Sequence, residues 1–146
     1  MTRQVRRLSD GEFERLLGFR DGLRRFLHWS DEQARSVGLT AAQHQLLLAV
    51  RGHRGHRRDP SISDIAEHLM LRHHSAVELI DRAVAAGLLG RVADTEDQRV
   101  VRLRLTPLGR RKVEALAAAH LEELSRLRVH FESLWSDLPT PGDDAR

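Results

Sequence analysis

The sequence predicts a mainly helical fold with a small two-stranded β-wing, in which a winged helix-turn-helix lobe lies between long N- and C-terminal helices. Three observations lead to this prediction. Apolar residues recur every three or four positions in long segments at both ends of the chain, as in amphipathic helices. Two short helical segments in the middle are separated by only a few residues. Two short segments of strand-like composition follow them.

The first helix is expected to begin at Ser9, because Ser9 and Glu12 have the spacing of a capping box. Its apolar periodicity continues to about Trp29, and a polar stretch follows. Thr40 and Gln43 form a second capping box, which begins a shorter helix. That helix ends before a loop rich in glycine, arginine and histidine.

A pair of short helices comes next. Ser61 is the expected N-cap of the first, with Asp64 in the first turn, where the helix dipole favours an anion. The second runs from about Arg72 to Ala86, and Gly87 suits the left-handed conformation that often ends a helix. Two helices joined by so short a turn indicate a helix-turn-helix.

Residues 88–92 and 100–105 are expected to form the two strands of a hairpin. In the second strand Arg102 and Arg104 alternate with apolar residues, as in a strand that is buried on one face. Pro107 then begins the last helix, because proline suits the first helical position.

The composition fits a globular protein. The chain has 146 residues, of which 40% are hydrophobic and 31% charged, and one domain of about 100–200 residues is the usual solution at this length. No apolar run approaches the roughly 18 residues of a membrane span, and the N-terminal residues lack the apolar stretch of a secretory signal. We therefore expect a soluble, cytoplasmic protein without a membrane partner. The sequence has no cysteine. Its absence excludes disulfides, thiolate nucleophiles and cysteine-based zinc sites.

The end helices carry more apolar surface than a domain this small can cover. Exposed apolar stripes of that size normally meet a partner, and the commonest partner is a second copy related by a two-fold axis. The sequence thus predicts a homodimer. Within a single domain spanning 1–146, we expect dimerisation helices at 9–37 and 107–137, a winged lobe at 40–106 and a tail at 138–146.

Basic residues gather in two segments without acids. The net charge is +3, and all but one of the 24 basic residues are arginine. Four bases lie within 51–58 and six within 98–113. Such runs are typical of a surface that binds a polyanion. Alternatively, these runs lie on a face that is merely solvated. The abundance of arginine could also reflect a GC-rich coding bias.

Several short motifs follow one another in a distinctive order and spacing, namely LTAAQ (39–43), ISDIAEHL (62–69), VELIDR (77–82), GLL (87–89), Arg91, Asp94, Asp97, Arg99 and LRLTPLG (103–109). In this order and spacing, they resemble the MarR family of winged helix-turn-helix transcriptional regulators over about residues 12–135. The resemblance implies a mostly helical dimer with a winged lobe in each subunit. It also implies binding to pseudo-palindromic operator DNA, usually with release by a small ligand, and we expect a repressor.

The resemblance assigns the second helix of the pair to DNA recognition. Its apolar residues would face the core of the lobe, so the remaining side chains would face double-stranded DNA, with the N-terminal ones nearest the base edges. The predicted DNA-binding residues are Arg72, His73, His74, Ser75, Glu78, Arg82, Arg99, Arg102 and Arg104.

Several of these residues have alternative roles. Glu78 either accepts a hydrogen bond from a cytosine amino group or, as we prefer, pairs with Arg82 one turn later. Arg99 either enters the minor groove or is held by Asp97 within the hairpin. Arg102 and Arg104 on the strand either contact phosphates or are merely solvated. His73 and His74 either contact DNA or are merely solvated. Gln98 stands where many family members carry arginine, which predicts a weaker grip of the wing on DNA.

The basic loop at 51–58 is longer than the connection usual in the family. It either reaches flanking phosphates or is a disordered surface loop. A small-molecule effector would need a pocket, which we expect between the end helices and the winged lobe, although a histidine on an apolar helix face is more often a core residue. The candidate lining residues are Phe26, His28, Trp29, His44 and His120.

No enzyme is expected, because the sequence has no glycine-rich phosphate loop, no HExxH motif and no evident pair of nucleophile and base. No cofactor or metal is expected either. A zinc site needs three or four convergent ligands, and the sequence has neither cysteine nor a histidine-carboxylate motif to supply them. A metal-responsive regulator remains an alternative because the chain has nine histidines. The other alternative is a winged-helix dimer that binds protein, but no aromatic residue lies between positions 30 and 130 to form such a surface.

Overall fold

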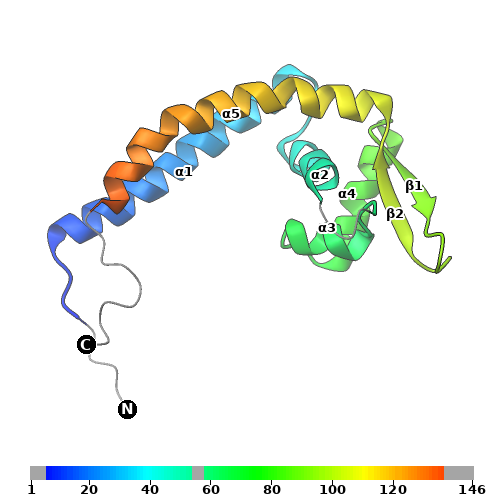
Figure 1. Cartoon of the computed structure of the whole chain (residues 1–146), viewed down its shortest axis with the longest axis horizontal. Helices are drawn as coiled ribbons and strands as arrows, with labels where there is room; N and C mark the ends of the chain where they lie inside the picture. The colour runs from blue at the N-terminus through cyan, green and yellow to red at the C-terminus, as the bar shows by residue number, and fades with distance from the viewer. Residues whose placement is uncertain (1–5, 54–57, 137–146) are drawn as a thin grey trace, which may run out of the picture. The chain divides into compact units, whose positions relative to one another are not determined.

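The computed structural model describes residues 6–53 and 58–136, and Figure 1 shows the order of the elements. Within these residues the fold is mainly helical with one two-stranded antiparallel sheet, as predicted. The predicted tail at 138–146 lies outside the described residues. The elements are α1 (Asp10–Ser36), α2 (Ala41–Gly52), α3 (Ile62–His68), α4 (His73–Ala85), β1 (Leu89–Ala93), β2 (Val101–Leu105) and α5 (Pro107–Trp135).

The chain divides into two compact units, and both α1 and α5 contribute to each of them. The first comprises Met1–Trp29 and His120–Arg146, and we call its described part the terminal-helix unit. The second comprises Ser30–Ala119, and we call it the winged unit.

Every secondary-structure element of the winged unit supplies aliphatic side chains to one core. Leu46 of α2, Ile65 of α3, Ile80 of α4 and Leu103 of β2 are all fully buried. Each such side chain contributes about 1.5–3 kcal/mol relative to an exposed position. This core fixes which faces of α3 and α4 point outward.

The starts of α2 and α3 were predictable because their caps are local. Thr40 and Gln43 form both hydrogen bonds of the predicted capping box before α2, and Ser61 and Asp64 do the same before α3. At the other end of α4, Gly87 has a φ of 73°, as expected for the left-handed residue that ends a helix.

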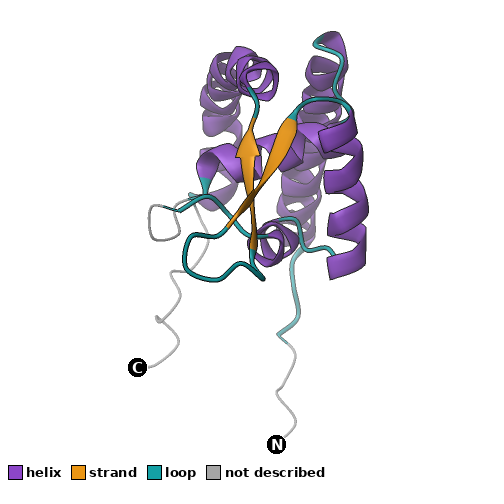
Figure 2. Ribbon diagram, turned by 90° about the vertical axis from the view of Figure 1, so that its right-hand side faces the viewer, coloured by secondary structure: helices purple, strands orange, loops and turns teal. Residues whose placement is uncertain are grey.

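The wing differs slightly from its predicted bounds. β1 pairs with β2 from Leu89↔Leu105 to Ala93↔Val101, and Figure 2 shows the two strands, which cross each other in that view. Leu88 is excluded from β1 because its N–H donates to the Ala83 carbonyl (2.9 Å) in the turn that ends α4. Both strands therefore begin one residue later than predicted.

Helix α1 is longer than its apolar periodicity indicated. That periodicity ends near Trp29, but the polar stretch after it is helical through Ser36, close to the end of the helix predicted at 9–37. Ser30 and Ala34 on this stretch are buried in the winged unit, and the chain turns only at Gly38, which has a φ of 77°. Tertiary burial, which a polar composition does not reveal, thus extends the helix.

In the terminal-helix unit α1 and α5 pack through glycine and aromatic residues. The Phe19 ring lies 5.5 Å from that of Phe131 and 5.4 Å from that of Trp135. A Cβ on Gly18 would lie only 3.2 Å from Leu134, so glycine permits this close approach. No helix in the described part of the chain is long and apolar enough to cross a membrane.

Candidate nucleic-acid interface

The outward face of α4 carries the predicted recognition residues. Of the apolar residues predicted to face inward, Ala76, Leu79, Ile80 and Ala83 are buried, and Val84 is half-buried against the core. The first turn of α4 holds no acid, and the side chain of the N-cap Arg72 makes no capping hydrogen bond. The N-terminal N–H groups of this helix can therefore face an anion. Of the predicted residues, Ser75 is half-buried, while the exposed ones are Arg72, His73, His74, Glu78 and Arg82.

The predicted ion pair between Glu78 and Arg82 is not formed. The neighbouring acid, Asp81, instead pairs with Arg91 of β1. No hydrogen bond or ion pair joins Glu78 to Arg82 in the part of the chain that the structure describes. The i,i+4 spacing permits such a pair but adds only a few tenths of a kcal/mol, roughly 0.2–0.5, to favour it.

Arg99 and Asp97 form the ion pair considered for the wing. Arg99 Nε donates to Asp97 Oδ1 (3.0 Å) and Nη2 donates to Oδ2 (3.1 Å). The backbone N–H of Arg99 also donates to Oδ1 (3.0 Å). These bonds, the side-chain ones first, lower the pKa of Asp97 below its ordinary value. The Arg99 side chain is nonetheless 91% exposed, so one face of its guanidinium group remains open to a partner.

Asp94 shapes the hairpin that carries this pair. Its Oδ2 accepts the backbone N–H groups of Asp97 (2.9 Å) and Glu96 (3.2 Å), and its Oδ1 accepts Arg102 Nε (3.0 Å). The side chain of Asp94 is only 7% exposed. The Asp97 N–H first, and Arg102 among the further donors, lower the pKa of Asp94 below its ordinary value. Asp94 is therefore a structural carboxylate of the wing.

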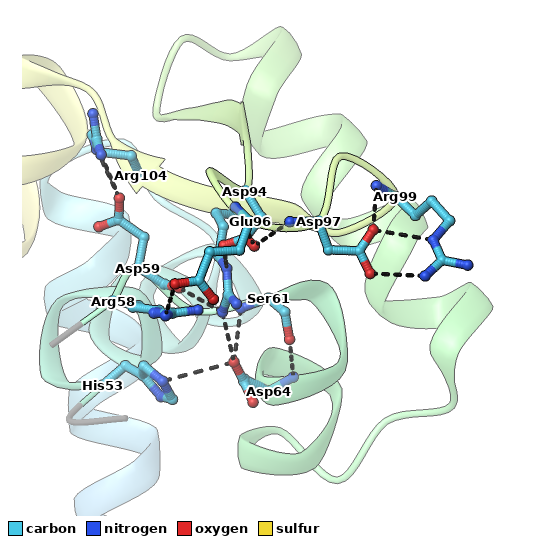
Figure 3. A network of polar contacts seen from close by, with 11 residues as sticks. His53, Arg58, Asp59, Ser61, Asp64, Asp94, Glu96, Asp97, Arg99 and Arg104 are labelled. Carbon is cyan, nitrogen blue, oxygen red and sulfur yellow. Dashed lines mark hydrogen bonds and ion pairs between the residues drawn. The ribbon is translucent and has the colours of Figure 1, made fainter. Parts of the chain in front are cut away.

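Arg102 turns toward the protein and is not merely solvated, whereas its predicted phosphate contact stays a prediction. Its side chain is 19% exposed, and besides Asp94 it contacts the backbone carbonyl of Asp59 (3.2 Å) and lies 3.9 Å from Asp64 Oδ2. Figure 3 shows this network from close by. The alternating pattern of β2 placed Arg102 on the correct face. It did not reveal that acceptors from a distant segment cover that face.

Two more exposed ion pairs join the wing to the residues that precede α3. Arg104 donates through Nε (2.9 Å) and Nη2 (2.6 Å) to Asp59 Oδ2, while its side chain remains 61% exposed. Arg58 Nη2 donates to Glu96 Oε1 (2.9 Å). Asp59 was not singled out in the sequence. An acid that follows a basic loop could have been expected to pair with one of the strand arginines, because opposite charges attract.

The centre of the basic loop, residues 54–57, lies outside the described residues, so its two predicted roles stay open. The flank at His53 is held by polar contacts. Its Nδ1 lies 3.0 Å from His68 Nε2, and its Nε2 lies 3.7 Å from Asp64 Oδ2. Across residues 6–53 and 58–136, no three histidine, aspartate or glutamate side chains gather as a metal-binding group.

The structure brings together three of the five residues predicted to line an effector pocket. In the terminal-helix unit the rings of Trp29 and His120 lie 4.8 Å apart, and the Phe26 ring lies 6.1 Å from each. His28 is exposed, and His44 is buried within the winged unit. A pocket that includes all five residues stays a prediction.

The acidic groups of this network predict a loss of stability in acid. The Asp94 pKa is lowered, and so is that of Asp64, where hydrogen bonds from Ser61 and the nearby His53 and Arg102 outweigh the effect of burial. A lowered pKa stabilises the fold above the ordinary value of about 4, and this stabilisation is lost as pH falls through the lowered pKa.

We therefore expect the free energy of unfolding to fall as pH drops from about 5 toward 2. The fall should be shallower in Asp94→Asn, which has no carboxylate to protonate at that position. Urea denaturation followed by circular dichroism across this range measures both profiles. Parallel profiles for parent and variant would contradict a role for the Asp94 charge in folding.

The comparisons with known proteins support one fold family. The MarR family model matches residues 37–100. The structure resembles AbsC, a MarR family transcriptional regulator from Streptomyces coelicolor, with 24% identity, a TM-score of 0.68, and coverage of 95% of this chain and 88% of AbsC. It also resembles MepR of S. aureus in a DNA complex, with 20% identity, a TM-score of 0.64, and coverage of 84% of this chain and 85% of MepR.

A third similar structure is BpsR of Bordetella bronchiseptica, described with the regulation of its DNA binding by 6-hydroxynicotinic acid. It shares 26% identity at a TM-score of 0.57, covering 83% of this chain and 79% of BpsR. No curated protein matches the sequence. The resemblance to the MarR family that the sequence indicated is confirmed by the match to the family model and by the similarity to these solved structures.

Proposed function

We propose that this protein, a MarR-family winged-helix protein, is a sequence-specific DNA-binding transcriptional regulator that represses from a pseudo-palindromic operator as a homodimer. The observation that carries the proposal is the exposed, acid-free N-terminal turn of α4, with Arg72, His73 and His74, on the same winged unit as the open Arg99. As a regulator of genomic DNA it would act in the cytoplasm.

Each part of this surface suits one kind of DNA contact. The N-terminal turn of α4 would lie in the major groove, where His73 and His74 offer donors or acceptors to base edges. The free N–H groups of that turn and Arg72 would hold a phosphate. Glu78, which does not pair with Arg82, is available to accept from a cytosine amino group. Arg99 would enter the minor groove, whose negative potential favours arginine.

The terminal-helix unit supports the homodimer. Its exposed side chains on α1 and α5 and just before α1 include Leu8, Phe13, Leu16, Leu17, Leu23, Leu27, Leu121, Leu124, Val129 and Trp135. An apolar hollow of about 300 Å³ lies among Leu8, Leu16, Phe19, Leu134 and Trp135. Apolar surface of this extent normally meets a partner, and an isologous contact with a second copy would cover it on both subunits.

A small-molecule effector would complete this regulator. The cluster of Phe26, Trp29 and His120 combines aromatic faces with a titratable ring, which suits a small aromatic ligand. Its place in the terminal-helix unit would let a ligand act on the dimer.

Selection of bound DNA from a random pool tests the proposed function. The expected result is a two-fold symmetric motif with half-sites about one helical turn apart. The variant Arg72→Ala, His73→Ala should bind that motif weakly, whereas Arg126→Ala, which removes an exposed cation from the terminal-helix unit, should bind like the parent. Recovery of no motif, together with capture of a protein partner, would instead support the protein-binding alternative.

The dimer predicts a separate result. Leu16→Lys with Leu121→Lys should yield a folded monomer, because both leucines are more than half exposed and the fold of one chain does not depend on them. Sedimentation equilibrium would measure the mass, and circular dichroism the fold. Leu48→Lys on α2, a leucine of the winged unit that is also more than half exposed, serves as the control and should remain dimeric. A parent that sediments as a monomer would overturn the homodimer.

A further inference from the structure

We propose that Arg102 is a positioning residue for DNA binding. Without touching DNA, it would hold the wing hairpin in the place from which Arg99 reaches the minor groove. The inference rests on the proposed DNA-binding function and deepens it. It assigns to Arg102 a role that the sequence pattern, which indicated a phosphate contact or simple solvation, did not suggest.

Arg102 joins three segments of the winged unit. Its Nε binds Asp94 at the end of the wing, its Nη1 binds the backbone carbonyl of Asp59, and it lies 3.9 Å from Asp64 on α3. Its backbone adds to this link, because Arg102 forms an isolated β-bridge with Ser61. One residue thus ties β2 to the hairpin and to the start of the helix-turn-helix.

A continuous series of contacts runs from Arg102 to the open arginine. Arg102 holds Asp94 Oδ1, and the other oxygen of Asp94 binds the Asp97 N–H (2.9 Å). Asp97 in turn binds both the backbone and the guanidinium group of Arg99. Each step is a hydrogen bond, and the series leads from the shielded Arg102–Asp94 pair to the exposed Arg99. Loss of the Arg102–Asp94 contact would therefore change where Arg99 is presented.

The other ion pairs of the wing do not have this character. Arg58–Glu96 and Arg104–Asp59 join exposed arginines to carboxylates that are a third or more exposed, and such pairs contribute little and exchange easily with phosphates. The Arg102–Asp94 pair is 19% and 7% exposed, and breaking a pair of this kind leaves a desolvated charge. DNA phosphates can compete for Arg58 and Arg104 but do not readily reach Arg102.

The two possible roles of the Arg102–Asp94 pair predict opposite changes in DNA affinity for Asp94→Asn. If Asp94 acts only through its charge, removing an acid from a DNA-binding surface strengthens binding. If it positions the wing through Arg102, the same substitution weakens binding. Asparagine keeps a side-chain oxygen for the hairpin N–H groups, so the substitution mainly weakens the bond to Arg102.

The test is the affinity of the full chain for its selected DNA, measured by fluorescence anisotropy over a series of salt concentrations. We expect Asp94→Asn to bind at least about fivefold more weakly than the parent. Glu96→Gln is the matched control, because it removes an exposed acid from the same hairpin, and it should bind as tightly as the parent or more tightly. Asp94→Asn that binds as tightly as the parent would overturn the proposal.

A double-mutant cycle separates positioning from a general loss of fold. Arg102→Lys keeps the charge but cannot bind Asp94 and the Asp59 carbonyl together with the same geometry, so it should weaken binding in the parent background. In an Arg99→Ala background it should cost little more, because the residue it positions is gone. Equal losses in both backgrounds would overturn the proposal, and circular dichroism confirms that each variant is folded. A parent that selects no DNA overturns the proposed function itself.

Discussion

Gly109→Ala is expected to destabilise the winged unit by about 3 kcal/mol, at the upper end of what overpacking usually costs. A Cβ at this position would lie 2.1 Å from the carbonyl oxygen of Leu88 and 3.0 Å from its carbonyl carbon. Because these are backbone atoms, no side-chain rotation relieves the clash. The first turn of α5 would have to move away from the chain that follows α4.

The position is sensitive because several contacts meet there. Leu88 accepts the Thr106 N–H (3.1 Å), and Gly109 donates its own N–H to the Thr106 hydroxyl (3.1 Å). Urea denaturation at fixed protein concentration measures the change, since dimerisation would make stability concentration-dependent. Gly52→Ala is the control, because a Cβ there meets nothing within 4 Å and alanine favours a helix. A parent-like midpoint for Gly109→Ala would contradict the packing described here.

Local signals in the sequence account for most of the elements that were predicted correctly. A capping box needs only two residues three positions apart, so Thr40 and Ser61 identified the starts of α2 and α3. The left-handed Gly87 is likewise a local requirement of the helix end. The helical period then placed the buried and exposed faces of α4 correctly.

The errors arose where a distant part of the chain decides the outcome. The apolar periodicity stopped short of the end of α1, because burial of Ala34 in the winged unit, rather than local propensity, extends the helix. The internal contacts of Arg102 were not predicted, because its acceptor Asp59 lies 43 positions earlier in the chain. Period-two alternation gives the face of a strand, but it does not tell which residues cover that face. Charge runs therefore overstate the cations that are free to meet DNA.

Arg99→Ala should show how much of the wing's binding depends on the exposed guanidinium group of Arg99. We expect operator binding to weaken by about 1–3 kcal/mol. The salt dependence of binding should fall by roughly one unit per occupied site, because one phosphate-neutralising charge is lost. The preference for A·T pairs in the flanks should relax as well, since a narrow minor groove attracts arginine. Anisotropy titrations on flank-substituted operators measure all three, with Arg126→Ala as the control for charge alone.

The role of Asp97 can be read from whether Asp97→Ala weakens or strengthens DNA binding. In the free protein Asp97 receives three hydrogen bonds from Arg99, so it either presents the guanidinium group to DNA or competes with DNA for it. If it presents Arg99, Asp97→Ala weakens binding as much as Arg99→Ala does, and the double variant loses no more than either, because the pair acts as one unit. If it competes, Asp97→Ala strengthens binding. Parent-like affinity and salt dependence in Arg99→Ala would contradict the insertion of Arg99 and leave the wing's contacts to the exposed Arg104.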